Sequence, residues 1–312
     1  MAPGMQSMLG YDQPLYVLPF DHRHSYGHEV FGFNEPMPPE QIAIVAASKG
    51  VIYEGFKRAL KAGVPKDRAA ILVDEEFGTK VLRDAHHEGF HFALPLEKSG
   101  EREFHFEFDD YEKRIEDFDP TFVKVLVRWN PGGDAAMNAR QAGRLKKVSD
   151  YCHRNKRVFM FELLVPPEQK QLDKFGGDHK VYDREVRPGL MITAIEELQE
   201  SGVEPDIWKI EGLDRKEDCV KLTAAARRDG RDNVGCIVLG RGEDEARVIT
   251  WLQTAAPIEG FIGFAVGRST FLQPIVDYRA KKLSADDAAD EIARRFREWV
   301  DVFEKARASV EA

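Results

Sequence analysis

The chain has 312 residues, of which 43% are hydrophobic and 32% charged, a composition typical of a globular protein with a large buried core. Its formal net charge of −9 argues against a protein whose main role is to coat nucleic acid or an anionic membrane, because both need a basic surface. The first residues lack a signal-peptide pattern, and no apolar run approaches the roughly 18 residues of a membrane span, so we expect a cytoplasmic protein without a membrane partner.

Short apolar runs rich in β-branched residues recur eight times and alternate with stretches of helical periodicity. They predict strands at residues 15–20, 69–74, 91–96, 121–127, 157–165, 206–210, 234–240 and 260–266. Helical periodicity predicts helices at residues 40–63, 134–154, 189–202, 215–230, 243–255 and 284–308, several ended by glycine and the last capped by Ser284.

The strands are apolar at successive positions, which fits a parallel sheet covered on both faces. Eight repeats of strand then helix favour an α/β fold with a single (β/α)8 TIM barrel over residues 1–312, of which 1–12 form a flexible N-terminus. A doubly wound sheet is the structural alternative, but no Gly-x-Gly-x-x-Gly follows the first strand.

Three ionisable residues lie inside apolar strands: Lys124, Glu162 and Lys209. If their faces point inward, the three side chains meet inside the barrel. A buried lysine beside a second cation loses its proton more easily and can attack a ketone, and the resulting iminium withdraws electrons from the adjacent carbon–carbon bond. Glu162 is the predicted general acid and base. The alternative is a buried salt bridge without catalytic meaning.

The last two predicted strands are each followed by a glycine and an arginine, in the sequences VLGRGED and AVGRSTF. Loops at these positions commonly form a phosphate site in such barrels. We therefore predict that Gly240, Gly242, Gly267 and Arg268 bind phosphate, with Arg241 as a further ligand. The alternative is that the glycines only permit tight turns and the arginines pair with surface acids.

Further ionisable residues within or just after strands are expected at the same end of the barrel. We predict that Asp21 is catalytic and that Asp74, Lys98 and Arg128 bind the substrate. His22 and His24 could join Asp21 and Asp74 as metal ligands, but we predict neither a metal nor an organic cofactor. A second histidine group, at residues 86–91, precedes the third strand and should lie at the opposite end.

Seven segments resemble, in order, the class I tagatose 1,6-bisphosphate aldolase family: LPFDHR, ILVDEEFG, LPLEKSG, FVKVLVRWNP, VFMFELLVPP, DIWKIEG and GFAVGRSTF. The resemblance implies that Lys209 forms the Schiff base, that Glu162 is the acid and base, and that Lys124 supports them. It also implies active-site positions for Asp21 and Lys98, and a phosphate-binding position for Arg268.

The segments DHRHSYGHEVFGF and LLVPPE are more similar to the aldolase-like domain that is fused to 5-dehydro-2-deoxygluconokinase in myo-inositol catabolism. This implies cleavage of 5-dehydro-2-deoxygluconate 6-phosphate to dihydroxyacetone phosphate and malonate semialdehyde. Arg241 and Arg128 depart from the tagatose pattern, and extra cations suggest a carboxylate, a sulfonate or a second phosphate on the substrate.

These observations predict a class I aldolase, a carbon–carbon lyase acting on a phosphorylated keto sugar or keto sugar acid. We expect this small molecule to be its partner and leave homo-oligomer formation open. One alternative is a sugar-phosphate-binding regulatory barrel without catalysis, and the other is a metal-dependent lyase.

Overall fold

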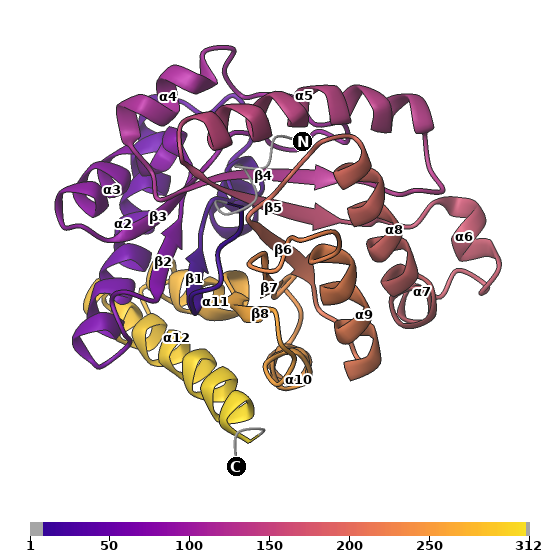
Figure 1. The fold of residues 1–312 in the computed structure, drawn as a ribbon. Coiled ribbons are helices and arrows are strands. Elements are labelled where there is room, and N and C mark those ends of the chain that lie inside the picture. The colour runs from indigo at the N-terminus through magenta and orange to yellow at the C-terminus, as the bar shows by residue number, and fades with distance from the viewer. Residues whose placement is uncertain (1–8, 310–312) are drawn as a thin grey trace.

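The computed structural model describes residues 9–309, and it is a closed barrel of parallel strands in chain order (Figure 1). The predicted (β/α)8 barrel is confirmed, and each predicted strand agrees with the observed one within two residues. The eight strands are β1 (Leu15–Pro19), β2 (Ala69–Leu72), β3 (His91–Pro95), β4 (Phe122–Arg128), β5 (Val158–Leu164), β6 (Ile207–Glu211), β7 (Gly235–Leu239) and β8 (Phe261–Ala265).

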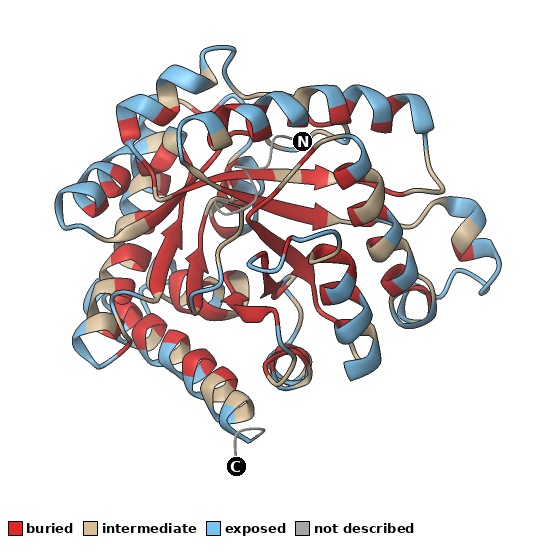
Figure 2. Ribbon diagram, viewed as in Figure 1, coloured by how far each residue is buried: buried red, intermediate tan, exposed pale blue. Residues whose placement is uncertain are grey.

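Helices cover the outer face of the barrel, and Figure 2 shows them buried on the side that faces the strands. The longer ones are α2 (Pro39–Lys61), α3 (Glu75–His87), α4 (Tyr111–Phe118), α5 (Ala135–Arg154), α8 (Arg187–Glu200), α9 (Lys216–Ala226), α10 (Glu245–Ala255), α11 (Arg268–Arg279) and α12 (Ala285–Ala308). Short segments are α1 (His24–Tyr26), the π-helix η2 (Gly27–Phe31), α6 (Gln169–Asp173) and α7 (His179–Glu185). The six predicted helices are all present, and each end agrees within four residues.

Hydrogen bonds to side chains fix the start of the last helix and the first described residues. Ser284 caps α12 as predicted, since its hydroxyl accepts a hydrogen bond from the Asp287 N–H at 3.0 Å. Of the N-terminal segment predicted to be flexible, residues 1–8 lie outside the described residues. The Gly10 N–H that follows them donates to Asp206 Oδ1 at 2.7 Å.

The barrel closes where β8 pairs with β1, with Leu15 opposite Gly263. A Cβ atom at position 263 would lie 1.7 Å from the Leu15 carbonyl oxygen, so only glycine permits this approach.

The interior of the barrel changes from apolar to charged along the strands. Phe122, Met160 and Ile207 belong to an apolar layer inside the barrel. The residues two positions further along the same strands share their face and are Lys124, Glu162 and Lys209. The charged side chains therefore lie next to this apolar layer, in the half of the barrel nearest the carboxyl ends of the strands.

In the part of the chain that the structure describes, no helix combines the length and the apolar character needed to cross a membrane.

Candidate active site

A cavity of about 400 Å³ opens at the carboxyl ends of the strands. Its wall contains side chains from every strand or following loop except those of β2, among the described residues. Ten of the predicted site residues line it, namely Asp21, Lys98, Arg128, Glu162, Lys209, Gly240, Arg241, Gly242, Gly267 and Arg268. Most of the predicted site residues therefore lie in the wall, at the end of the barrel where such folds carry their sites.

Lys124 lies fully buried behind this wall and is surrounded by carboxylates. Its Nζ atom is 2.9 Å from Asp21 Oδ2, 2.6 Å from Glu97 Oε1 and 2.9 Å from Glu162 Oε2. Two of its N–H groups donate to Asp21 and Glu97, and Glu162 is a third carboxylate that forms an ion pair with it. Burial lowers the pKa of Lys124, but the three carboxylates outweigh it and hold the pKa well above its ordinary value. Lys124 is therefore a fixed cation.

Lys209 occupies a different position, because it reaches the cavity wall. The β5–β6 register places it opposite Glu162, and its Nζ lies 2.7 Å from Glu162 Oε2. Among the described residues, Glu162 is the one carboxylate within 4 Å of this amine. A ligand in the cavity can contact Lys209, and a proton can pass between the amine and Glu162.

The carboxylates of Asp21 and Glu162 are ionised in this arrangement. Burial raises the pKa of Glu162, but the adjacent ammonium groups of Lys124 and Lys209 outweigh it, and the net shift is downward. Burial also raises the pKa of Asp21, but Lys124 and Lys209 outweigh it and hold the pKa well below its usual range. Both side chains can therefore accept a proton at neutral pH.

Glu97 lies just after the third strand in the sequence, where no role was predicted for it, and it is a site residue. One of its carboxylate oxygens is 2.6 Å from Lys124 Nζ, and the other accepts a hydrogen bond from the Leu126 N–H at 3.1 Å. Its own carbonyl accepts a hydrogen bond from Arg23 Nη2 at 2.9 Å. The predicted group of two amines and one carboxylate was thus incomplete, because three carboxylates surround Lys124. The sequence signal was the acid beside Lys98 in LPLEKSG.

His22 also lines the cavity, although the sequence suggested it only as a metal ligand. Burial lowers the pKa of this imidazole to about 4, a shift that Asp21 opposes and Arg268 reinforces. The ring is therefore neutral at neutral pH. Its Nδ1 atom is buried and makes no hydrogen bond to any described residue.

The loops after β7 and β8 meet beside the N-terminus of α11. Arg268 opens this helix, and its Nη2 donates to the carbonyl oxygen of Arg241 at 2.8 Å. A helix N-terminus with a neighbouring guanidinium favours an anion, as predicted for these loops. Gly267 has a packing role as well, because a Cβ atom there would lie 2.2 Å from the Pro19 carbonyl oxygen.

The prediction that Asp74 contacts substrate is wrong. Asp74 is fully buried, accepts a hydrogen bond from the Phe77 N–H at 2.8 Å as the N-cap of α3, and forms an ion pair with buried Lys49. It does not reach the cavity wall. Its carboxylate therefore joins α2 and α3 instead of meeting a ligand.

Lys98 and Arg128 lie on the β3–β4 side of the cavity, across the eight-stranded barrel from the β7–β8 loops. Arg128 Nη1 donates to the Glu101 carbonyl oxygen at 2.8 Å, and Lys98 Nζ is 2.9 Å from Glu101 Oε1. Both cations face the cavity. An anionic ligand would therefore meet positive charge from Lys98 and Arg128 on one side and from Arg268 on the opposite side.

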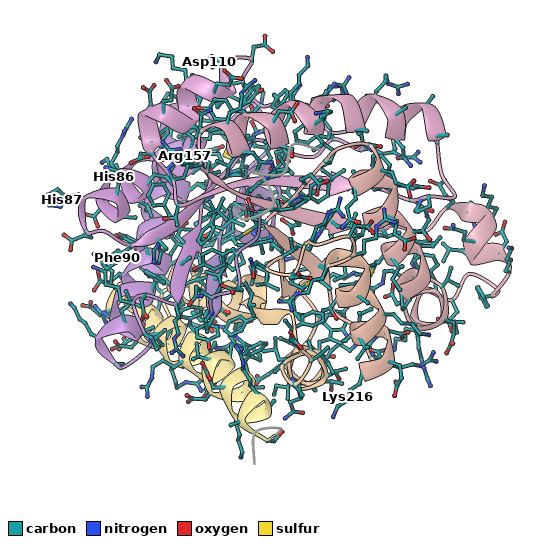
Figure 3. The ribbon with its side chains drawn as sticks, in the orientation of Figure 1. His86, His87, Phe90, Asp110, Arg157 and Lys216 are labelled. Atoms are coloured by element: carbon teal, nitrogen blue, oxygen red, sulfur yellow. The ribbon has the colours of Figure 1, made fainter. Side chains whose placement is uncertain are left out.

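Within residues 9–309, no group of three or more His, Cys, Asp and Glu side chains is arranged to hold a metal ion. Three of the four side chains considered for such a site have other partners. Asp21 and Asp74 pair with lysines, and His24 Nε2 lies 3.4 Å from Glu76. Figure 3 shows His86 and His87 at the outer edge of the molecule, away from the strands.

The fold and the site define a (β/α)8-barrel protein with a lysine–carboxylate cluster at the base of its cavity. Residues 10–307 match the family described as "Uncharacterized protein conserved in bacteria (DUF2090)", and the chain belongs to this family.

Several solved structures share the fold at low sequence identity. One is the fructose-bisphosphate aldolase of Plasmodium falciparum in complex with TRAP and a small-molecule inhibitor, at 13% identity and TM-score 0.64, covering 96% of this chain and 93% of that one. Another is an archaeal fructose 1,6-bisphosphate aldolase at 12% identity and TM-score 0.59, covering 94% of each chain. A third, from Slackia heliotrinireducens, has 12% identity and TM-score 0.56, with 90% and 86% covered. At these identities the likeness concerns the fold.

Proposed function

We propose that the protein is a class I aldolase in which Lys209 forms a Schiff base with a phosphorylated ketose. One observation carries this proposal: Lys209 lies at the cavity wall in contact with Glu162, while Lys124 behind it is fully buried among three carboxylates. Lys209 is therefore the reactive amine, and Lys124 is the amine that remains a cation. The fold shared with aldolases and the seven ordered motifs support the same chemistry.

The first chemical stage is formation of the iminium. Glu162 accepts the proton of Lys209 along their 2.7 Å contact, which leaves a neutral amine beside the substrate ketone. The amine attacks the carbonyl carbon, and after proton transfer Glu162 returns a proton to the carbinolamine oxygen, which leaves as water. Lys124 stabilises the carboxylate form of Glu162 between these steps.

The second stage is cleavage of the carbon–carbon bond. Asp21 is ionised and lines the cavity, so it is placed to remove the proton of the hydroxyl on the carbon that will become the aldehyde. The electron pair of the breaking bond moves into the iminium and leaves an enamine on Lys209. Protonation of the enamine carbon and addition of water then release dihydroxyacetone phosphate and regenerate the amine.

Charge in the cavity supports an anionic substrate. Seven Lys and Arg residues line the wall against five Asp and Glu residues, although the whole chain has a net charge of −9. The β7–β8 loops and Arg268 would hold the phosphate of the ketone half. Arg128 and Lys98 across the barrel would meet an anionic group on the aldehyde half.

The specific substrate that we propose is 5-dehydro-2-deoxygluconate 6-phosphate, as in myo-inositol catabolism. Two features support it. The segments DHRHSYGHEVFGF and LLVPPE resemble the aldolase-like domain fused to 5-dehydro-2-deoxygluconokinase. The second product, malonate semialdehyde, carries a carboxylate that matches the guanidinium of Arg128.

The test is an assay of dihydroxyacetone phosphate release from this substrate, with and without a chelator. Release that persists in the chelator supports the Schiff-base route, whereas loss of activity that returns with added metal supports a metal-dependent lyase. Binding of the sugar phosphate without any release would favour a regulatory barrel.

A further inference from the structure

Arg241 lines the cavity, but its guanidinium is paired with carboxylates beside it. Nη1 donates to Asp183 Oδ2 at 2.7 Å, and Nε lies 3.4 Å from Glu211 Oε1. The side chains of Asp183 and Glu211 are only 11% and 6% exposed. The positive charge of Arg241 is therefore matched by these two carboxylates.

A second arginine closes the group. Arg187 is buried, and its Nε lies 3.2 Å from Asp183 Oδ1 and its Nη1 3.6 Å from Glu211 Oε1. We call these four residues, Asp183, Arg187, Glu211 and Arg241, the Arg241 cluster. Two cations and two anions balance, so removal of one member leaves a buried charge without its partner.

The backbone of Arg241 is joined to the predicted phosphate loop. Arg241 and Gly242 both have left-handed backbone conformations, with φ of 55° and 76°. The Arg241 carbonyl oxygen accepts the hydrogen bond from Arg268 Nη2 at 2.8 Å. A Cβ atom at Gly242 would lie 2.5 Å from Arg268 Cζ, so the guanidinium of Arg268 rests directly on this glycine.

We propose that Arg241 is a positioning residue for the anion site and that Arg268 is the guanidinium that contacts the anion. The Arg241 cluster fastens the β7–α10 loop to β6 and α7. The fastened loop presents its carbonyl and Gly242 to Arg268 and so fixes the guanidinium at the N-terminus of α11. This inference rests on the anion site of the proposed function and is independent of the Schiff base.

A double-mutant cycle separates this role from direct contact with the anion. The variants are Arg241→Met, Asp183→Asn and both together, and the readout is the dissociation constant of inorganic phosphate by isothermal titration calorimetry. If Arg241 is a positioning residue, each single change weakens binding by about tenfold, and the double variant is no weaker than either, because all three break one connection.

A direct ligand gives the opposite pattern. Asp183→Asn would then release Arg241 toward the anion and tighten binding or leave it unchanged, while Arg241→Met would weaken it. That pattern overturns the inference, as does a wild-type protein that binds no phosphate. If Asp183→Asn is too unstable to be measured, Glu211→Gln takes its place, because it breaks the second contact of Arg241.

The matched control is Arg215→Gln, which removes an arginine paired with Glu185 outside the cluster and should leave the dissociation constant unchanged. Borohydride trapping judges the proposed function separately. Phosphate binding without a lysine adduct would reject the Schiff base and leave the inference standing. An adduct on Lys209 together with additive losses of phosphate affinity in the double-mutant cycle would support the Schiff base and overturn the inference about Arg241.

Discussion

Glu162 on β5 faces Lys209 on β6 across one strand pair, with Oε2 2.7 Å from Nζ. The same oxygen lies 2.9 Å from Lys124, so one carboxylate atom connects the amine at the cavity wall to the cation behind it. Proton transfer from Lys209 to Glu162 needs no movement of the backbone.

Glu162→Gln should reduce kcat by about 100- to 10,000-fold, because the amide can neither accept the proton of Lys209 nor return one to the carbinolamine. The amine remains, so slow covalent capture of the ketone should still occur. Steady-state cleavage and borohydride capture measured on the same preparation check this. A variant with wild-type kcat would remove Glu162 from the mechanism.

Glu97→Gln should lower kcat by about 10- to 100-fold with little change in KM, since Lys124 loses one of its three anchors. The pH profile gives the sign of the effect. Carboxylates raise the pKa of Lys124, so loss of one lowers that pKa, and the alkaline limb of the kcat profile should move to lower pH. An unshifted alkaline limb would contradict the role given to Glu97.

Asp74→Asn should destabilise the protein by about 3–5 kcal/mol, because it leaves buried Lys49 without its counter-ion, while kcat per folded molecule stays unchanged. Urea unfolding and active-site titration measure the two effects. Asp134→Asn is the matched control, since Asp134 also caps a helix, through the Met137 N–H at 3.0 Å. A large loss of kcat in Asp74→Asn alone would restore Asp74 to the site.

Arg268→Gln should raise KM for the phosphorylated substrate by about 10- to 100-fold, the effect of losing a hydrogen bond to a charged group. An unphosphorylated ketone should be turned over by the variant and the wild type with similar kcat/KM. The ratio of kcat/KM for the two substrates is therefore the measurement. Equal losses on both would place Arg268 outside the phosphate site.

The sequence predicts the barrel and its central charges well because both depend on local pattern. Apolar runs of strand length mark all eight strands, and alternation along β4, β5 and β6 places Lys124, Glu162 and Lys209 on inward faces. A charged side chain in the middle of such a run is expected to point into the barrel, because helices cover the outer face of the strand.

The sequence pattern does not reveal an ion pair whose partner lies in a distant segment of the chain. Asp74 looks like any acid at the end of a strand, and only the fold brings Lys49 from α2 to meet it. Arg241 has its partner Asp183 58 positions earlier. At the end of β3, Glu97 and Lys98 are adjacent, and which of them points to the centre depends on the bridge between Glu97 and Phe106.

The measurement that tests the central claim most directly is borohydride reduction in the presence of dihydroxyacetone phosphate, followed by intact-mass and peptide mass spectrometry. We expect a single reduced adduct on Lys209, no adduct in Lys209→Met, and an unchanged adduct in Lys216→Met, a control on the surface helix α9. A folded protein without an adduct on any lysine, or with the adduct on Lys124, would rule out Lys209 as the Schiff-base residue.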